Sequence, residues 1–217
     1  EDADLVVLNS CVVRQSAEDK VSYRVSISQE FKKDRPEQML VLMGCMVGPN
    51  SENLQKRFPS VDMFMRPQDF NPLLEQIAEL NDVDLEGCIS NYAHSNPGIS
   101  CHVPIIKGCD FMCSFCIIPY RRGRQESRTI RDIVSEVSIL VDRGVKEITL
   151  LGQTVDAYGH DLNEDVDLAD LLGHVNDITG LERIRFLTSH PSFMSEKIIE
   201  SINELPKVCE HINLPIK

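Results

Sequence analysis

The stretch Val103-Pro104-Ile105-Ile106-Lys107-Gly108-Cys109-Asp110-Phe111-Met112-Cys113-Ser114-Phe115-Cys116 joins a short apolar run to a C-x3-C-x2-C loop. Three thiolates in so short a loop can hold three irons of a four-iron cluster. The fourth iron then lacks a protein ligand and can bind a small molecule. S-adenosylmethionine needs such an open iron, which it binds by its amino and carboxylate groups. The loop therefore predicts a cluster site held by Cys109, Cys113 and Cys116.

A zinc site is the alternative interpretation of the same loop. Zinc usually takes four ligands, commonly as two C-x2-C pairs. Only one such pair is present, Cys113 and Cys116, and the three-residue gap before it is unusual for zinc. Cys101 or His102 would have to supply the fourth ligand. The spacing favours the iron–sulfur cluster but leaves zinc open.

The loop lies within a series of apolar runs that alternate with amphipathic segments. Helices are predicted after Thr129, which forms a capping box with Asp132, and after the N-cap residues Asp167 and Ser195. Parallel strands place their functional loops at their carboxyl ends. We therefore expect one rim to collect the cluster loop, Gly152-Gln153, Ser189-His190 and the residues from Pro215 onward. The predicted strands are 102–106, 147–151, 184–188 and 211–215.

A similar alternation precedes the loop and predicts a small parallel α/β domain over residues 1–80. Its last helix is expected to start at an Asp69 cap. Residues 81–100 have no clear period and are interpreted as a linker, and residues 101–217 form the second series. The predicted strands of the first domain are 4–10, 39–43 and 61–65, with helices over about 17–34 and 51–58. The last helix, after Asp69, carries Leu73, Leu74, Ile77 and Leu80.

Composition limits the class of protein. The 217 residues carry a formal net charge of −12, so we do not expect the overall charge to attract nucleic acid. Any contact with nucleic acid must depend on local groups of positive charge. No apolar run is long enough to span a membrane. Eight cysteines among long periodic helices favour a reducing cytoplasm over a disulfide scaffold. The chain lacks an initiator Met, and we expect a fragment whose first strand is missing.

Two further cysteines are candidate ligands because of where they stand. Cys11 and Cys45 each follow a predicted strand, on neighbouring loops of one sheet. A ligand role is favoured over that of a small buried hydrophobe. Cys101 and Cys209 lie in or near predicted strands, where core packing is favoured.

These motifs closely resemble those of the radical-SAM methylthiotransferases along nearly the whole chain. The amino-terminal match is carried by Asn9-Ser10-Cys11-Val12-Val13-Arg14 and Gly44-Cys45. The entry loop from Val103 to Tyr120 is similar to that of these enzymes, as is Arg122-Gly123-Arg124 after it. The resemblance implies an α/β protein, in which a small parallel domain is followed by part of a radical-SAM (β/α) partial barrel.

The resemblance also implies two four-iron clusters and a product with a methylthio group on an unactivated carbon. One cluster cleaves S-adenosylmethionine. An auxiliary cluster, held by three cysteines of the amino-terminal domain, handles the sulfur, and a second S-adenosylmethionine donates the methyl group. Cys11 and Cys45 match two of those cysteines, while the third is expected before Glu1. Cys88 has no assigned role, but the residues around it do not match those around the third auxiliary cysteine of the family.

Within the family, Val12-Val13-Arg14, Leu150-Leu151-Gly152-Gln153 and Phe186-Leu187-Thr188-Ser189-His190-Pro191 resemble the branch that modifies isopentenyladenosine beside the tRNA anticodon. Alternative acceptors are threonylcarbamoyladenosine of tRNA and an aspartate of a small-subunit ribosomal protein. A zinc-stabilised or electron-carrier module is the non-enzyme alternative. The resemblance implies a tRNA anticodon stem-loop, a reductant such as flavodoxin or ferredoxin, and a sulfur donor as partners.

Four more residues are expected to contact the cofactor. Gly152-Gln153 stands where related enzymes often carry a Gly-Gly-Glu that contacts the methionine amino group, and Ser189 lies at the same predicted rim. Phe115 is expected against the cluster or the adenine, although an aromatic residue before a Cys is also ordinary core. His190 is either a cofactor neighbour or a structural residue at a helix entry.

Two charged groups have both a functional and a structural interpretation. A basic group at the predicted mouth could contact RNA phosphate or the cofactor carboxylate, or could be solvated surface. Its members are Lys107, Arg121, Arg122, Arg124, Arg128 and Arg131. The carboxylates between Asp161 and Asp170 favour a solvated loop and helix start over a calcium site.

Overall fold

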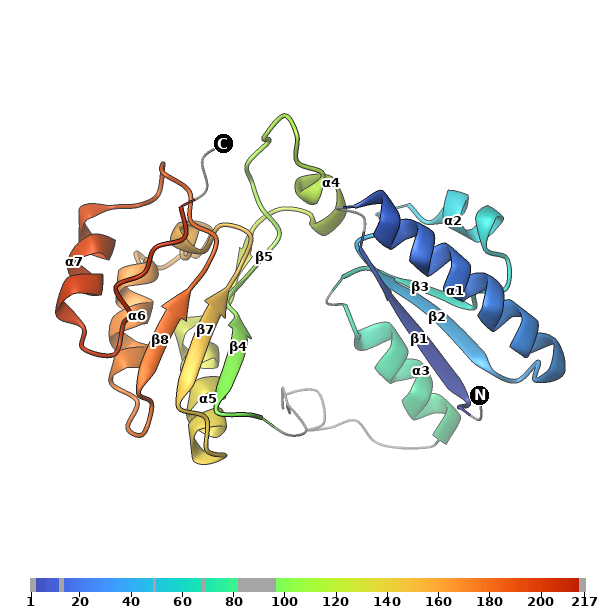
Figure 1. Ribbon diagram of the computed structural model, residues 1–217, viewed down its shortest axis with the longest axis horizontal. Coiled ribbons are helices and arrows are strands. Elements are labelled where there is room, and N and C mark those ends of the chain that lie inside the picture. Colours follow the sequence, from blue (N-terminus) through green and yellow to red (C-terminus); the bar gives the residue numbers. More distant parts are fainter. Residues whose placement is uncertain (1–2, 12–13, 49, 68, 82–96, 215–217) are drawn as a thin grey trace. The chain divides into compact units, whose positions relative to one another are not determined.

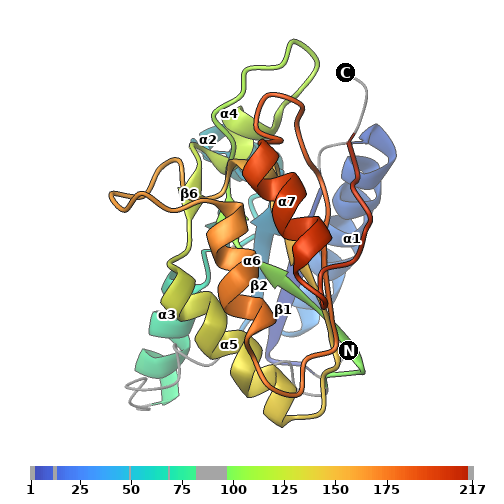
Figure 2. The ribbon, with the colours of Figure 1, turned by 90° about the vertical axis from the view of Figure 1, so that its left-hand side faces the viewer.

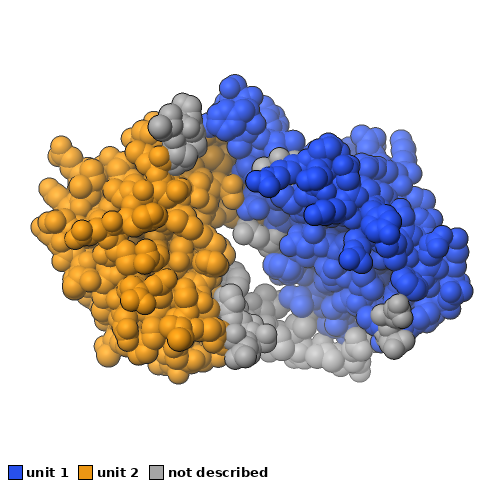
Figure 3. Space-filling model, viewed as in Figure 1, with its two compact units in different colours: residues 1–86, 112–122 blue, residues 87–111, 123–217 orange. Residues whose placement is uncertain are grey.

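The computed structural model describes residues 3–11, 14–48, 50–67, 69–81 and 97–214. The chain divides into two compact units (Figure 3). The first comprises Glu1–Glu86 and Met112–Arg122, and the second comprises Gly87–Phe111 and Gly123–Lys217. The second half of the cysteine loop therefore groups with the amino-terminal unit, while its first half groups with the carboxyl-terminal unit. None of the helices among the described residues is both long and apolar enough to cross a membrane.

The first unit is a three-stranded parallel sheet in the order β1-β2-β3, with helices on both faces (Figure 1). The central strand β2 is an apolar run, as expected of a strand covered on both sides. Leu40 and Leu42 pack on one face with Val25 of α1, while Val41 and Met43 face α3 on the other. The elements are β1 (Leu5–Ser10), α1 (Gln15–Asp34), β2 (Met39–Gly44), α2 (Glu52–Arg57), β3 (Met63–Met65), α3 (Asn71–Asn81) and α4 (Ile118–Arg122).

The second unit is built on a parallel sheet in the order β4-β7-β8. Three helices lie side by side over it (Figure 2), and their apolar faces share one core with the strands. A short antiparallel pair, β5 and β6, adjoins the cysteine loop. The elements are β4 (Ser100–Pro104), β5 (Ile106–Lys107), β6 (Glu126–Ser127), α5 (Ile130–Asp142), β7 (Glu147–Leu151), the 3-10 helix η1 (Val155–Ala157), α6 (Leu168–Asn176), β8 (Arg183–Phe186) and α7 (Glu196–Glu204).

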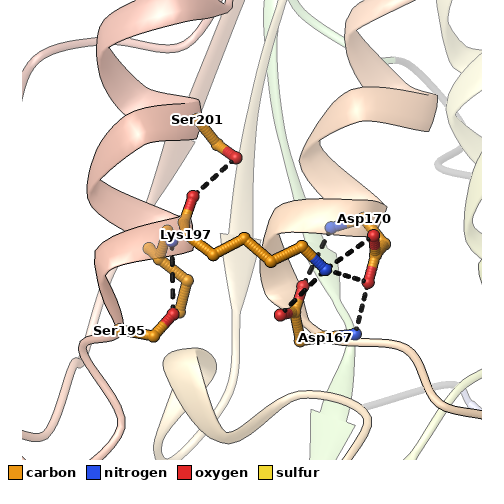
Figure 4. A network of polar contacts seen from close by, with 6 residues as sticks. Asp167, Asp170, Ser195, Lys197 and Ser201 are labelled. Carbon is orange, nitrogen blue, oxygen red and sulfur yellow. Dashed lines mark hydrogen bonds and ion pairs between the residues drawn. The ribbon is translucent and has the colours of Figure 1, made fainter.

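Side-chain caps set the starts of these helices, as predicted from the sequence. The Ser195 side chain accepts the Ile198 N–H, and the Thr129 side chain accepts the Asp132 N–H. The return bond from the Thr129 N–H to the Asp132 side chain is absent among the described residues, so the capping box expected there is only half formed. Asp167 and Asp170 form a reciprocal capping box at the start of α6. Lys197 of α7 reaches across to both of these carboxylates and so joins the two helix starts (Figure 4).

The strand expected over residues 102–106 is two strands. β4 ends at Pro104, although the Ile105 N–H still donates to Leu151 O at the end of β7. The chain then leaves the sheet, and Ile106 pairs with Ser127. The prediction was wrong here because the apolar run contains no sign of the change of partner.

The strand expected over 211–215 is absent from the described residues, which end at Leu214. The main chain of Ile184 is already engaged by Lys207 and Cys209, in an isolated bridge around Val208. Ile212 and Leu214 are exposed, so no described element covers the apolar face that a strand here would need.

The start of α3 also differs from the prediction. Helix α3 begins at Asn71, and Phe70 rather than Asp69 precedes it, with Pro72 tolerated in its first turn. Asp161 is exposed, as expected of a solvated loop, and it also accepts hydrogen bonds from the Ser127 N–H and the Gln125 side chain, which join this loop to β6. The linker expected over 81–100 is shorter at both ends, because Asn81 is the last residue of α3 and Ser100 is the first of β4. Its residues 82–96, Cys88 included, and the rim residues from Pro215 onward lie outside the described residues.

Candidate functional site

The two amino-terminal thiols stand at adjacent strand ends, as predicted. Cys11 follows Ser10, the last residue of β1, and Cys45 follows Gly44, the last residue of β2. Ser10 and Gly44 are partners in the parallel register, and the Cys45 N–H donates to Ser10 O over 3.0 Å. Cys11 is exposed, whereas Cys45 is buried. Parallel pairing thus brings both residues to the carboxyl edge of one sheet.

The turn after β2 is fixed by backbone geometry and by one buried hydroxyl. Gly44 has a φ of 100°, and a Cβ there would overlap the carbonyl of Ser10. Ser10 Oγ donates to Met43 O at 2.6 Å and accepts the Met46 N–H at 3.1 Å. The Ser10 side chain therefore holds the two residues that flank Gly44-Cys45 in the chain.

Arg122 of α4 reaches the buried thiol. Its Nε lies 3.4 Å from Cys45 Sγ, and both residues belong to the first unit. Others in the basic group have partners as well: Lys107 lies 3.4 Å from Glu126, and Arg128 forms an ion pair with the buried Glu136 at 2.6 Å. The prediction that these cations face RNA or cofactor does not hold for Arg128, whose guanidinium also donates to Pro104 O.

Cys109 is anchored in the second unit by its backbone and its side chain. Gly108 before it has a φ of 72°, and a Cβ there would overlap the Arg124 carbonyl. The Cys109 N–H donates to Gly123 O at 3.1 Å, and its Sγ lies 3.7 Å from Thr154 Oγ1. The Gln125 N–H donates to Asp110 Oδ1 at 3.0 Å. The first cysteine of the loop thus has a defined place at the end of β5.

The remaining two cysteines form a compact turn in the first unit, where the Cys116 N–H donates to Cys113 O at 3.0 Å. Both thiols are partly exposed and free. Phe115 between them is 73% exposed, so the core interpretation of this residue was wrong. Its expected contact with a cofactor remains a prediction.

The donor set has the right chemistry for an iron–sulfur cluster, because the loop offers three free thiols that are open to solvent. Within the described residues, no three His, Cys, Asp or Glu side chains are arranged as ligands of one metal ion. Cys109 belongs to one unit, and Cys113 and Cys116 to the other.

The residues available for zinc do not favour that alternative. Cys101 is buried in the core of the second unit, and its neighbour His102 is exposed on the opposite face of β4. Burial, followed by the charge of Glu136, raises the pKa of the Cys101 thiol. Because metal ions bind the thiolate, a raised pKa makes Cys101 a poor ligand.

The rim predicted from the strand ends forms between the loops after β7 and β8. The Val155 N–H donates to Thr188 O at 2.8 Å, which joins the two loops. Gly152 lies against β5, where a Cβ would meet Ile106 Cβ at 3.1 Å, and Gln153 is half-buried beside it. Ser189 is 1% exposed, and its Oγ has no hydrogen-bond partner among the described residues.

Sequence reasoning missed several residues that build this rim. Asp156 is 1% exposed, and its carboxylate accepts the His190 N–H at 2.7 and 3.0 Å. Thr188 has a φ of 72°, which is rare for a β-branched residue. Strain of this kind clusters at functional sites. Neither feature has a local sequence signal, because each depends on partners distant in the chain.

Comparison with known proteins places the chain in a family. The model of the radical SAM superfamily matches residues 103–217, and a second, described as Uncharacterized protein family UPF0004, matches residues 1–66. The chain belongs to the radical SAM superfamily. The cobalamin-dependent S-adenosylmethionine radical enzyme OxsB is a structural neighbour, with a TM-score of 0.59 and 10% identity over 99% of this chain and 35% of that one. At this identity the likeness concerns the fold alone.

Curated relatives from several bacteria cover this radical SAM chain completely, and each is named tRNA-2-methylthio-N(6)-dimethylallyladenosine synthase. The protein from Herpetosiphon aurantiacus is 47% identical, and the chain covers 50% of it. The Roseiflexus protein is also 47% identical with 46% covered, and that of Chloroflexus aurantiacus is 44% identical with 47% covered. The chain spans about half the length of the curated relatives it matches.

Proposed function

We propose that this chain is part of a tRNA methylthiotransferase that inserts a methylthio group at C2 of N6-isopentenyladenosine next to the anticodon. The observation that carries the proposal is the pairing of two cysteine sets in one chain. Cys11 and Cys45 sit at adjacent strand ends ahead of the C-x3-C-x2-C loop. The names of relatives 44–47% identical over the whole chain support this choice of acceptor.

In this proposal residues 1–80 are the methylthiotransferase amino-terminal domain, 81–100 a linker and 101–217 the radical-SAM core. Cys109, Cys113 and Cys116 would hold the cluster that binds S-adenosylmethionine, and Cys11 and Cys45 would belong to an auxiliary cluster. When bound, a four-iron cluster and S-adenosylmethionine together supply the electron and the 5′-deoxyadenosyl radical that activates the acceptor carbon.

The rim residues would bind and orient the cofactor. Gly152 follows the last residue of β7, and its main chain would lie beside the cofactor. Gln153 beside it would contact the amino group of the methionine moiety. The buried Ser189 hydroxyl is available as a donor because it has no partner among the described residues. Phe115, exposed on the cluster loop, would cover the cluster or the adenine.

The partners follow from the same proposal. The substrate would be the anticodon stem-loop of tRNA, and a flavodoxin or ferredoxin would supply electrons, with a separate sulfur donor. Because the net charge is −12, contact with RNA would depend on local cations such as the exposed Arg124 and Arg131. Such an enzyme would work in the cytoplasm, where its tRNA substrate resides.

Anaerobic reconstitution with iron and sulfide tests the chemistry. We expect broad visible absorption from iron–sulfur clusters and formation of 5′-deoxyadenosine from S-adenosylmethionine under a reductant. Replacing Cys113 by Ala should abolish deoxyadenosine formation while leaving the amino-terminal thiols intact. Colourless protein that binds zinc would reject the enzyme in favour of a zinc-stabilised module.

The acceptor is tested in cells that lack their own methylthiotransferase. Expression of the chain within its full-length gene should restore 2-methylthio-isopentenyladenosine in tRNA, measured by nucleoside mass spectrometry. Restoration of the methylthio form of threonylcarbamoyladenosine, or of a modified ribosomal aspartate, would instead assign one of the other acceptors.

A further inference from the structure

Four aromatic rings gather where the cluster loop meets the rim of the second unit. Phe111 lies between Cys109 and Cys113, and its ring stacks on His190 with a centroid separation of 4.2 Å and an interplanar angle of 19°. Phe193 meets the Phe111 ring edge-on at 5.2 Å, and His160 meets Phe193 at 4.7 Å. The rings come from three loops that are distant in sequence, those after β5, η1 and β8.

The His190 ring is a fixed platform. Its Nδ1 accepts the Ser192 N–H at 3.2 Å, which sets the plane of the imidazole. The main-chain N–H of His190 donates to the buried Asp156, and the main-chain carbonyl of His190 accepts the Phe193 N–H at 2.9 Å. The loop after β8 is therefore fixed by hydrogen bonds that do not involve Phe111.

Phe111 directly follows the last residues of the cluster loop that are hydrogen-bonded to the second unit. Cys109 and Asp110 are held by hydrogen bonds to Gly123 and Gln125. Within the described part of the chain, the main chains of Phe111 and Met112 form no hydrogen bond. The Met112 side chain is 68% exposed, so the Phe111 ring is the last packed anchor before the loop leaves the second unit.

We propose that Phe111 is a positioning residue that fixes the Cys109 end of the cluster loop to the rim by stacking on His190. Offset-stacked and edge-to-face pairs gain attraction beyond their buried area, so the contact can hold the part of the loop, Phe111 and Met112, whose main chain forms no hydrogen bond among the described residues. Losing the ring would free Cys109 from its place beside Thr154. The inference rests on the proposed function, because it assigns Phe111 a part in presenting a cluster ligand.

The first test measures thiol exposure in the iron-free full chain, so that it does not depend on the chemistry of the enzyme. Cys109 alkylation by iodoacetamide is followed by mass spectrometry in wild type, Phe111→Ala, His190→Ala and the double variant. We expect each single variant to raise the Cys109 rate several-fold, and the double variant to be no faster than the faster single one. Met112→Ala, at the exposed neighbouring position, should match wild type.

A conservative variant separates stacking from general loosening. Phe111→Tyr keeps the ring and should restore the wild-type alkylation rate, whereas Phe111→Leu, with an apolar side chain but no ring, should not. Circular dichroism melting of every variant identifies those that do not fold. If all folded variants alkylate at the wild-type rate, if Met112→Ala is as fast as Phe111→Ala, or if the two rings act independently, the proposal is wrong.

The second test uses the reconstituted protein. Phe111→Ala should raise the KM for S-adenosylmethionine more than it lowers kcat for deoxyadenosine formation, and should alter the electron paramagnetic resonance spectrum of the reduced cluster with S-adenosylmethionine. An unchanged KM and spectrum would overturn the positioning role. Absence of a cluster in wild type would instead reject the proposed function and leave the alkylation result standing.

Discussion

At the scale of single residues, the Cys109 site depends on a glycine that no other residue can replace without strain. Gly108 combines a φ of 72° with a position where a Cβ would overlap the Arg124 carbonyl. Gly144 has a similar φ of 96° but open space around the absent Cβ. The two glycines therefore separate the cost of the backbone conformation from the cost of the overlap.

Gly108→Ala should lower the free energy of unfolding by about 2–4 kcal/mol, because the cost of the steric overlap adds to the cost of the left-handed backbone. Gly144→Ala should cost only the backbone part, about 1–2 kcal/mol. Urea unfolding of both variants measures the difference. Equal losses would mean that the chain beside Gly108 relaxes freely, and that the Cys109 anchor is looser than described.

At the scale of elements, the junction between α6 and α7 is a charged cluster around Lys197 (Figure 4). Partial burial tends to raise the pKa of Asp170, but hydrogen bonds from Lys197 and from the Asp167 N–H outweigh it and leave that pKa lowered. A carboxylate with a lowered folded pKa stabilises the fold fully above its unfolded value and loses that contribution as the pH falls through the folded value.

Asp170→Asn should therefore cost at most about 1 kcal/mol near neutral pH, because the ion pair with Lys197 is solvent-screened. The difference from wild type should shrink as the pH falls below the unfolded aspartate pKa of about 3.9. Denaturant unfolding across this range measures it, with Asp142→Asn at the exposed end of α5 as control. A difference that stays constant into acid would show that the carboxylate charge plays no part.

The elements also show what sequence could and could not predict. Caps such as Thr129 and Ser195 were found because their partners lie three residues away. The pairing of β5 with β6 was missed because its partner lies about 20 residues along the chain. The placement of Cys11 and Cys45 was predicted because parallel register follows from alternating strands and helices. The strain at Thr188 and the stack on His190 were not, since both depend on tertiary contacts.

At the scale of the molecule, the two units have separate apolar clusters. The large cluster contains only residues between 101 and 208, and the two smaller ones contain only residues between 5 and 77. Separate clusters allow each unit to open without the other.

Leu172→Ala, at a fully buried position in the second unit, should cost about 2–5 kcal/mol. Hydrogen exchange should then speed up across β4, β7 and β8 while β1 and β2 keep their wild-type protection. Leu42→Ala in the first unit is the reciprocal control and should give the opposite pattern. Uniform acceleration across both units in either variant would contradict separate cores.

The central claim is that Cys109, Cys113 and Cys116 hold a four-iron cluster with one iron open to S-adenosylmethionine. Its most direct test is electron paramagnetic resonance of the reduced, reconstituted chain in which Cys11 and Cys45 are replaced by Ala. The account predicts a cluster signal that changes on addition of S-adenosylmethionine, with couplings to isotope labels in its amino and carboxylate groups. A signal that does not respond to S-adenosylmethionine, or that survives replacement of all three loop cysteines, would contradict it.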